Sequence, residues 1–431
     1  MRIQDIYKLF LEAGSICTDS REVQPGSFFF ALKGENFNGN EYASDALTRG
    51  CAYAVIDERQ YLKDNRTILV ENSLTTLQAL AEYHRSQFPV ELIAITGSNG
   101  KTTTRELISA VLGTGKKVLS THGNLNNHIG LPLTLLKLNK GTKIAVIEMG
   151  ANHIGEIGRL CEISKPTHGL ITNIGYAHIE GFGSEEGVIQ AKSELYTWLG
   201  KNKGVIFRNS DDKILNKISP PGSQIVPYSI KEAGVGNFEV FGADPFLQLV
   251  WENEGEKLKL NTQLFGSYNL INIVAAISVG MYFGIAREKI IEAIESYSPE
   301  NNRSQIRQTE KQNVLVLDSY NANPSSMTVA IESFLNLGGK NKVLILGDMF
   351  ELGPNSLDEH VKLVHILEGI KDMKAILLGK SFKKAAVSTS FQCFSSTDEC
   401  FKYLKRNPLE NSLILLKGSR MMALESLVSA L

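Results

Sequence analysis

Short apolar runs alternate with amphipathic stretches through the middle of the chain. The apolar runs at residues 91–96 (ELIAIT), 143–147 and 169–174 have the length of strands that are buried on both faces. Between them, apolar positions at helical spacing predict helices at 103–112 and 185–199. Strands that alternate with helices are typical of a doubly wound, mostly parallel α/β sheet.

The pattern changes on both sides of this central region. Upstream, short strand-like runs are separated by turn signals such as Gln24-Pro25-Gly26, and a helix is predicted near residues 73–85. Downstream, residues 236–265 favour antiparallel strands, and a predicted helix at 268–283 precedes a polar linker at 298–302. Beyond the linker, further strands separated by helices are predicted at 314–317, 342–346 and 413–416.

We therefore predict an α/β protein of three domains. A small N-terminal α/β domain covers residues 1–84, a central doubly wound domain with a phosphate loop covers 85–300, and a Rossmann-like α/β domain covers 301–431. The length of 431 residues agrees with this division, at about 150 residues per domain.

Charge and composition exclude several classes of protein. The net charge of −1 gives no positive field to hold a nucleic-acid backbone or an anionic membrane. No apolar run approaches the roughly 18 residues that span a bilayer, and Asp5, Lys8 and Glu12 interrupt the N-terminus where a signal peptide would be apolar. Scattered cysteines without a Cys-x-x-Cys pair predict free thiols. We expect a cytoplasmic protein that inserts into no membrane.

The strongest local motif is Thr96-Gly97-Ser98-Asn99-Gly100-Lys101-Thr102-Thr103-Thr104, between a predicted strand and a predicted helix. Its glycines allow backbone N–H groups to turn toward an anion, and the helix N-terminus adds partial positive charge. Lys101 is placed to neutralise phosphate oxygens, and the Thr102 hydroxyl to reach Mg²⁺. The motif departs from the general Walker A spacing, so we interpret it as a variant phosphate loop, and an ordinary strand-to-helix turn is the alternative.

Two polar residues follow predicted strands of the same sheet. Glu148 comes directly after the strand 143–147, and the carboxyl ends of parallel strands form the usual ligand crevice. Glu148 is a candidate Mg²⁺ ligand, and a solvated glutamate at a strand end is the alternative. His178 follows the strand 169–174 and could ligate a metal, contact phosphate or be structural.

Lys192 falls on the apolar face of the predicted helix 185–199. The helical repeat places it with Val188 and Leu195, among the side chains that are buried. Burial lowers the pKa of a lysine, and a neutral amine reacts with CO₂ to give a carbamate that could hold Mg²⁺. The alternative is a lysine whose ammonium reaches the surface along its apolar stem.

The loop sequence TGSNGKTTT resembles the nucleotide loop of the Mur ligases and of the related folylpolyglutamate synthetases. The segment Gln190-Ala191-Lys192-Ser193-Glu194-Leu195 resembles the family segment whose lysine is carbamylated. The resemblance implies ATP and Mg²⁺ as cofactors. It also implies that the metal is held by Thr102, Glu148, His178 and carbamylated Lys192.

Further stretches narrow the resemblance within the family. They lie at residues 18–21 (TDSR), 123–134 (GNLNNHIGLPLT), 318–327 (DSYNANPSSM), 346–353 (LGDMFELG) and 417–420 (KGSR). They resemble the Mur ligases that add D-alanyl-D-alanine to UDP-N-acetylmuramoyl-tripeptide. The Asp-Asn-Pro-Arg motif expected of the diaminopimelate-adding ligases is missing.

The resemblance implies an ATP-dependent amide ligase. It would join UDP-N-acetylmuramoyl-tripeptide to D-alanyl-D-alanine through an acyl phosphate and give the pentapeptide precursor of peptidoglycan. The N-terminal domain would bind the UDP-sugar, and the C-terminal domain would bind the dipeptide and close over ATP. We expect a monomer.

The same resemblance implies roles for individual residues. The residues implied in catalysis are Lys101, Lys192, His178 and Arg303. The residues implied in ATP binding are Gly97, Ser98, Asn99, Gly100, Lys101, Thr102, Thr103, Asn269, Asn272, Arg303 and Asp318. The residues implied in substrate binding are Ser20, Arg21, Asn126, Asn127, Tyr320, Asn321 and Asn323.

Other functions stay open from the sequence alone. One is a Mur-type or folylpolyglutamate synthetase-like ligase with a different amino substrate. Another is a P-loop kinase or switch NTPase that forms no amide, and a third is a nucleotide-binding scaffold without catalysis. The intact Lys101, Thr102, Glu148 and Lys192 argue against the scaffold. The sequence does not decide whether the third peptide residue is lysine or diaminopimelate.

Overall fold

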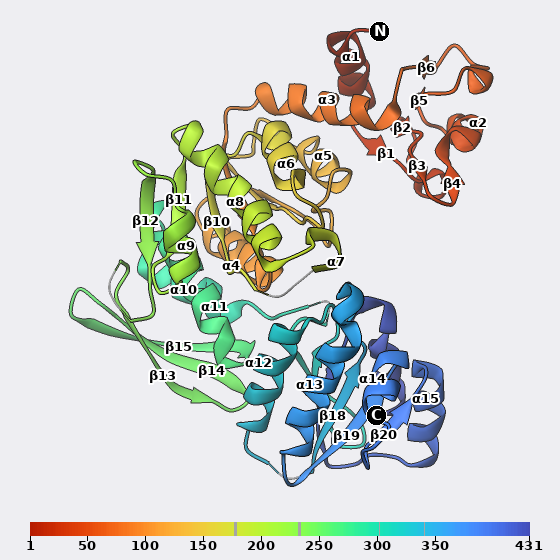
Figure 1. Ribbon diagram of the computed structural model, residues 1–431. Coiled ribbons are helices and arrows are strands. Elements are labelled where there is room, and N and C mark those ends of the chain that lie inside the picture. Colours follow the sequence, from red (N-terminus) through yellow and green to blue (C-terminus); the bar gives the residue numbers. More distant parts are fainter. Residues whose placement is uncertain (176–178, 232–233, 301, 340) are drawn as a thin grey trace.

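In the computed structural model, three α/β domains follow one another along the chain (Figure 1). The structure describes residues 1–175, 179–231, 234–300, 302–339 and 341–431. The N-terminal domain (red and orange) joins the central domain (yellow and green) through α3, Ser73–Ser86, which packs against helices of the central domain. The C-terminal domain (blue) lies at the other end of the view.

The N-terminal domain is built on a parallel sheet in the order β1-β2-β5-β6. Phe28 and Phe30 pack on the face covered by α1 and α3, and Phe29 packs on the face covered by α2. This alternation follows from the two-residue period of a strand. The elements are α1 Ile3–Ala13, β1 Ile16–Cys17, β2 Phe28–Phe30, the hairpin β3 Lys33–Gly34 and β4 Phe37–Asn38, α2 Ala43–Thr48, β5 Tyr53–Ile56 and β6 Thr67–Leu69.

Six parallel strands form the central sheet, in the order β12-β11-β10-β7-β9-β8. From β7 the chain goes to the edge strand β8, returns to β9 and then crosses β7 to reach β10. This reversal opens a crevice at the carboxyl ends of β7, β9 and β10, where doubly wound sheets bind their ligands. The strands are β7 Glu91–Thr96, β8 Val118–Ser120, β9 Ile144–Glu148, β10 His168–Ile171, β11 Val205–Asn209 and β12 Gln224–Tyr228.

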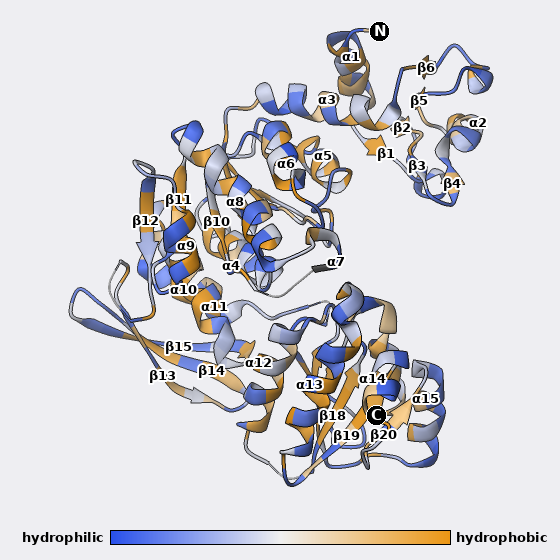
Figure 2. Cartoon of the chain, in the orientation of Figure 1, coloured by the Kyte–Doolittle hydropathy of each residue, from blue (hydrophilic) through white to orange (hydrophobic). Residues whose placement is uncertain are grey.

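Helices cover both faces of the central sheet, and the apolar strands lie between them (Figure 2). One face is covered by α4 Lys101–Gly113, α10 Leu270–Tyr282 and α11 Arg287–Ser296. The other face is covered by α5 Gly130–Leu135, α6 Glu156–Ser164, α8 Glu185–Lys201 and α9 Lys213–Ile218, with the short α7 Ile179–Phe182 beside α8.

A three-stranded antiparallel sheet extends from the central domain, as the sequence predicted for residues 236–265. Its strands are β13 Asn237–Ala243, β14 Phe246–Asn253 and β15 Glu256–Phe265. Trp251 and Leu260 bury the sheet against the core under α10 and α11. Because β15 leads through a 3₁₀ turn at Ser267–Asn269 into α10, it delivers the start of α10 to the crevice.

The C-terminal domain has a six-stranded sheet in the order β16-β17-β21-β18-β19-β20, parallel except for β16. Helices α12, α13 and α14 cover one face, and α15 with the 3₁₀ segment Leu424–Ala430 covers the other. The elements are β16 Gln305–Gln308, β17 Val314–Asp318, α12 Pro324–Leu335, β18 Lys342–Gly347, α13 Ser356–Glu368, β19 Met373–Leu378, α14 Lys380–Ala385, β20 Gln392–Phe394, α15 Thr397–Arg406 and β21 Leu413–Lys417.

The predicted elements of the central domain are confirmed, with shifted ends. β7 has the predicted bounds, whereas β10 ends at Ile171 instead of residue 174. It ends early because residues 172–175 turn away to bond the phosphate loop. In the C-terminal domain the structure adds β16, β19 and β20 to the predicted strands. Within the described ranges, no helix combines the length and the apolar character needed to cross a bilayer.

Candidate active site between the central and C-terminal domains

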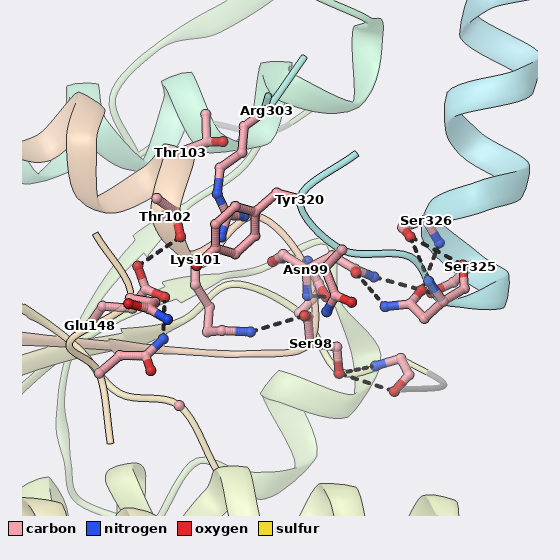
Figure 3. A pocket seen from close by; sticks show the side chains of 18 of the residues that line it. Ser98, Asn99, Lys101, Thr102, Thr103, Glu148, Arg303, Tyr320, Ser325 and Ser326 are labelled. Carbon is pink, nitrogen blue, oxygen red and sulfur yellow. Dashed lines mark hydrogen bonds between the residues drawn. The ribbon is translucent and has the colours of Figure 1, made fainter. Parts of the chain in front are cut away.

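A cavity of about 1030 Å³ lies between the central and C-terminal domains. Its walls come from the phosphate loop, the ends of β9 and β10, the start of α10, the ends of β17 and β21 and the start of α12. The carboxyl ends of both parallel sheets therefore face the same space, which is the expected position of a ligand site for each of them. Figure 3 shows the side chains that meet there.

Glycine is required at two positions of the phosphate loop. Gly97 has a φ of 142° and Gly100 a φ of 78°, a region that other residues rarely adopt. A Cβ atom on Gly97 would collide with the Thr172 hydroxyl, and one on Gly100 would lie 2.8 Å from Oδ1 of Asn272. The loop can therefore pack closely against both β10 and α10, and α4 begins directly after it with its positive end toward the cavity.

The turn after β10 fixes the shape of the loop. The Thr172 hydroxyl donates to the Asn99 carbonyl oxygen at 2.6 Å, and the Asn99 N–H donates to Oδ1 of Asn173 at 3.0 Å. The Ser98 N–H donates to the Asn173 carbonyl oxygen, and the Ser98 hydroxyl to that of Gly175, both at 3.0 Å. These bonds hold the loop in one conformation before any anion binds.

Lys101 lies over the loop, with its ammonium group bonded to loop carbonyls (Figure 3). Its Nζ donates to the carbonyl oxygens of Gly97 at 2.8 Å and Ser98 at 3.1 Å. Enclosure in the site lowers the pKa of Lys101, the Glu148 carboxylate opposes this shift, and the Arg303 charge adds to it. The site thus presents two neighbouring cations to an incoming anion.

Thr102 and Glu148 meet at the floor of the cavity. The Thr102 hydroxyl donates to Oε2 of Glu148 at 2.8 Å, and Nδ2 of Asn126 donates to Oε1 of Glu148 at 2.8 Å. Glu148 is only 1% exposed, so the alternative of a solvated glutamate does not hold. A buried carboxylate beside a hydroxyl and an amide offers the oxygen donors that Mg²⁺ prefers.

Lys192 is 1% exposed on α8, which confirms the predicted burial and excludes an ammonium that reaches the surface. Its Nζ donates to the Ala151 carbonyl oxygen at 3.4 Å and lies 5.0 Å from the centre of the Phe182 ring. Burial, followed by the positive charge of Lys101, lowers the pKa of Lys192 to about 7. A substantial fraction of this amine is therefore neutral near physiological pH.

Asn269 and Asn272 line the cavity at the start of α10. Nδ2 of Asn269 donates to the Phe265 carbonyl oxygen at 2.7 Å, and Nδ2 of Asn272 donates to Oδ1 of Asn269 at 2.9 Å. The Thr104 hydroxyl donates to Oδ1 of Asn272 at 3.1 Å. This bond connects Asn269 and Asn272 to the first turn of α4, which follows the phosphate loop.

Arg303 enters the cavity from the connection between the domains. Its guanidinium stacks on the Tyr320 ring, 3.8 Å from the ring centre (Figure 3). Asp318, at the end of β17, accepts the Ser304 N–H at 3.2 Å and forms an ion pair with the buried Lys417 at the end of β21. The C-terminal domain therefore contributes cations and a carboxylate to the same space as the phosphate loop.

Asn99 connects the phosphate loop directly to the C-terminal domain. Nδ2 of Asn323 donates to Oδ1 of Asn99 at 2.8 Å, and Nδ2 of Asn99 donates to the Ser325 hydroxyl at 3.1 Å. Asn323 is also the N-cap of α12, where its Oδ1 accepts the Ser326 N–H. The start of α12 is thus held against the loop (Figure 3).

Three family models match the chain in succession. The model of the Mur ligase family, catalytic domain, matches residues 13–94, that of the Mur ligase middle domain matches 95–280, and that of the Mur ligase, glutamate ligase domain, matches 302–420. The chain belongs to the Mur ligase family.

Individual Mur ligases resemble the chain over nearly its whole length. Two curated relatives are named UDP-N-acetylmuramoyl-tripeptide--D-alanyl-D-alanine ligase and are each 34% identical. The match to the ligase from Buchnera aphidicola subsp. Baizongia pistaciae spans 97% of this chain and 92% of the length of that ligase. The match to the ligase from Bacillus subtilis strain 168 spans 96% of this chain and 92% of the length of that ligase.

Solved Mur ligase structures share the fold. MurF from Acinetobacter baumannii matches with a TM-score of 0.86 and 29% identity, over 99% of this chain and 97% of its own. MurF from Thermotoga maritima in complex with ADP matches with a TM-score of 0.85 and 27% identity, over 96% of each chain.

Not every residue implied by the Mur ligase resemblance lies at the cavity. Ser20 and Arg21 are in the N-terminal domain, where Arg21 forms an ion pair with Asp19. Lys192 and Gly97 are not among the residues that line the cavity, and His178 lies outside the described residues. The residues that the structure does bring together there are Ser98, Asn99, Gly100, Lys101, Thr102, Thr103, Asn126, Asn127, Glu148, Asn269, Asn272, Arg303, Asp318, Tyr320, Asn321 and Asn323.

Several residues that shape this Mur ligase site are not among the predicted site residues. Thr172 and Asn173 fall within the strand predicted at residues 169–174. Lys417 directly follows the apolar run 413–416, as Asp318 directly follows the run 314–317. This shared position at the end of a strand could have indicated Lys417 as a site residue. Ser325 gave no signal, because its importance arises from a contact between two domains.

Proposed function

We propose that this Mur ligase joins D-alanyl-D-alanine to UDP-N-acetylmuramoyl-tripeptide at the expense of ATP, which gives the pentapeptide precursor of peptidoglycan. One observation carries the proposal. The phosphate loop with Lys101, the carboxylate Glu148 and the cation Arg303 of the C-terminal side line a single cavity. Relatives that bear the name of this ligase match the chain over nearly its full length.

ATP binds with its phosphates on the loop in this proposal. Phosphate oxygens replace the loop carbonyls as acceptors of Lys101, and the backbone N–H groups at the start of α4 add further donors. Asn269 and Asn272 lie beside the nucleotide, and Asp318 is placed to accept from a ribose hydroxyl. The MurF of Thermotoga maritima, solved with ADP, is a precedent within the family.

The reaction has two steps in which atoms balance. A carboxylate oxygen of the tripeptide attacks the γ-phosphorus of ATP, the bond to ADP breaks, and an acyl phosphate forms. The amine nitrogen of D-alanyl-D-alanine then attacks the acyl carbon, phosphate leaves with the former carboxylate oxygen, and the amine loses a proton. The first step brings two anions together, and Lys101 and Arg303 offset their repulsion and stabilise the charge on the transferring phosphate.

Magnesium fits the donors at the floor of the cavity. Thr102 and Glu148 supply a hydroxyl and a carboxylate, whereas no three His, Cys, Asp or Glu side chains of the described ranges lie together as a metal site. We propose that His178 and a carbamate on Lys192 complete the set, because the amine of Lys192 is buried and easily neutral. When bound, the metal would neutralise the transferring phosphate and polarise its oxygens.

In this proposal the UDP-sugar substrate reaches from the N-terminal domain to the cavity, and the dipeptide enters from the C-terminal domain. Ser20 and Arg21 hold the UDP end in the N-terminal domain, and Asn126 and Asn127 flank the peptide. The dipeptide is bound by the C-terminal domain, through Tyr320, Asn321 and Asn323. The domain boundaries that serve these tasks are placed near residues 84 and 300. We further propose a monomer in the cytoplasm, where ATP is available.

The proposal is tested by phosphate release with ATP, Mg²⁺ and UDP-N-acetylmuramoyl-tripeptide, with and without D-alanyl-D-alanine, followed by mass spectrometry of the products. We expect a pentapeptide that appears only when the dipeptide is present, with one phosphate released per amide. Parallel reactions with lysine and diaminopimelate tripeptides identify the preferred third residue. An amide formed with another amino acid, or ATP hydrolysis without any amide, would contradict the proposal.

A further inference from the structure

A chain of polar contacts leads from the Glu148 carboxylate away from the cavity. Arg105, on α4 and 4% exposed, places its Nε 3.4 Å from Oε2 of Glu148. Its Nη2 donates to Oε1 of Glu106 at 2.7 Å, and the Tyr297 hydroxyl donates to Oε2 of Glu106 at 2.6 Å. The two oxygens of Glu106 therefore connect the arginine beside Glu148 to Tyr297.

Tyr297 stands where the connection between the domains begins. It directly follows α11, which ends at Ser296, and the next residues lead to Arg303. Burial, and then the Glu106 carboxylate, raise the pKa of Tyr297, so its hydroxyl keeps its proton and remains a hydrogen-bond donor. The bond to Glu106 consequently anchors the first residue of the connection to α4.

The far end of the connection is anchored in the C-terminal domain. The Ser304 N–H donates to Asp318, and the Ser304 hydroxyl shares a hydrogen bond of 2.7 Å with the Tyr268 hydroxyl. Asn302 and Ser304 have φ values of 56° and 52°, a left-handed conformation that asparagine tolerates and that serine adopts at a cost. Arg303 lies between these two left-handed residues, in a connection that is anchored at both ends.

The Arg105 side chain has an unused bonding group. Its Nε is buried and makes no hydrogen bond, although Oε2 of Glu148 lies 3.4 Å away. A buried N–H without an acceptor is costly. This favours a second position of the Glu148 carboxylate, in which Oε2 accepts the Nε–H of Arg105. The carboxylate would move to this position when a ligand replaces its hydrogen bond with the Thr102 hydroxyl.

We propose that Arg105, Glu106 and Tyr297 are positioning residues that couple the Glu148 carboxylate to the connection carrying Arg303. The inference rests on the proposed function, since it assumes that Glu148 and Arg303 act on the same nucleotide. Occupation of the floor of the cavity would then favour the placement of Arg303 at the transferring phosphate. None of the three residues lines the cavity, so each acts through its neighbours.

The test uses Tyr297→Phe, which removes only the hydroxyl, Glu106→Gln, which removes the charge facing Arg105, and the double variant. The matched control is Tyr282→Phe, on α10, where the ring packs with His168 and Phe207. Two quantities are measured for each full-length protein. They are kcat and KM for all three substrates, and the gain in affinity for a non-hydrolysable ATP analogue on addition of Mg²⁺, by calorimetry.

The coupling predicts a specific pattern of results. In each single variant kcat falls about tenfold, the size of a lost hydrogen bond to a charged group, while KM for tripeptide and dipeptide stays within about twofold. The Mg²⁺-dependent gain in affinity shrinks, and binding of the analogue without Mg²⁺ is unchanged. The double variant is no worse than the worse single variant, because the residues act in series.

Two outcomes would overturn the coupling. One is a wild-type kcat and a wild-type Mg²⁺-dependent gain in both Tyr297→Phe and Glu106→Gln, and the other is a double variant whose loss is the product of the single losses. Thermal unfolding of each variant separates these results from misfolding. If the wild-type protein itself forms no amide, the proposed function fails instead, while the calorimetric comparison still tests the coupling.

Discussion

The side-chain amides of Asn99 and Asn323 bond to each other across the boundary between two domains, with 2.8 Å between Oδ1 of Asn99 and Nδ2 of Asn323. Asn99 belongs to the phosphate loop, and Asn323 caps α12 of the C-terminal domain. The amide pair holds the two halves of the candidate site together without any ligand. Loss of this bond should therefore weaken the assembly of the site more than the fold.

Replacement of Asn323 separates these two roles. Asn323→Ser keeps an N-cap oxygen but is too short to reach Asn99, so we expect kcat/KM for D-alanyl-D-alanine to fall about tenfold with nearly unchanged stability. Asn323→Ala also removes the cap and should lower the free energy of unfolding by about 1 kcal/mol. The control is Asn72→Ser, at the N-cap of α3, which should leave kinetics unchanged. Equal kinetics in Asn323→Ser and wild type would refute this role.

Lys101→Ala should abolish turnover and leave the fold intact. Its ammonium is the only charge on the loop itself, and without it the phosphate oxygens lose their closest cation. We expect kcat to fall by about three orders of magnitude, the scale reported for lost electrostatic stabilisation of a transition state. Lys137→Ala, at an exposed position, serves as the control. A near-normal kcat in Lys101→Ala would remove the basis of the phosphate-loop assignment.

Lys192 should make stability depend on pH. Burial and the Lys101 charge lower the pKa of its amine to about 7 in the folded chain, against 10.5 for an ordinary lysine. Between these values the unfolded chain binds a proton that the folded chain does not. Stability therefore rises with pH in this window, by at most about 1.4 kcal/mol per pH unit, and the full penalty of burying the charge applies below pH 7.

Urea unfolding in CO₂-free buffer measures this effect. We expect Lys192→Met to be more stable than the wild type at pH 7, because it buries no charge, and the advantage should shrink as the pH rises from 7 to 9. The exposed Lys137→Met should show no such trend. A difference between Lys192→Met and wild type that stays constant over this range would contradict the lowered pKa.

The carbamate proposed on Lys192 has its own test. Lys192→Ala should be nearly inactive, because the oxygens that complete the metal site are gone, and added short carboxylic acids should partly restore kcat. We expect formate and acetate to restore more activity than larger acids, because the site around Lys192 is buried. Native mass spectrometry should show an added mass of CO₂ on the wild type and none on the variant. Wild-type activity in Lys192→Ala would dismiss the carbamate.

Local patterns were sufficient for the elements that carry single groups. The apolar run 91–96 and the glycines after it located β7 and the phosphate loop, and the helical repeat placed Lys192 inside the protein. These features depend on residues that are neighbours in sequence, where strand and helix periods apply.

Contacts between distant segments could not be predicted in the same way. Lys417 pairs with Asp318 because β21 lies directly beside β17 in the sheet, an order that neither strand encodes alone. The early end of β10 had the same origin, since Thr172 and Asn173 leave the strand to bond Asn99. In both cases the packing of whole elements decides the position of the side chain, and local propensity does not.

The most direct test of the central claim follows an oxygen atom. UDP-N-acetylmuramoyl-tripeptide labelled with ¹⁸O in its terminal carboxylate is incubated with the protein, ATP, Mg²⁺ and D-alanyl-D-alanine, and the released phosphate is analysed by mass spectrometry. Ligation through an acyl phosphate predicts one ¹⁸O in each phosphate, formed together with the amide. Amide formation with unlabelled phosphate, or labelled phosphate without amide, would contradict it.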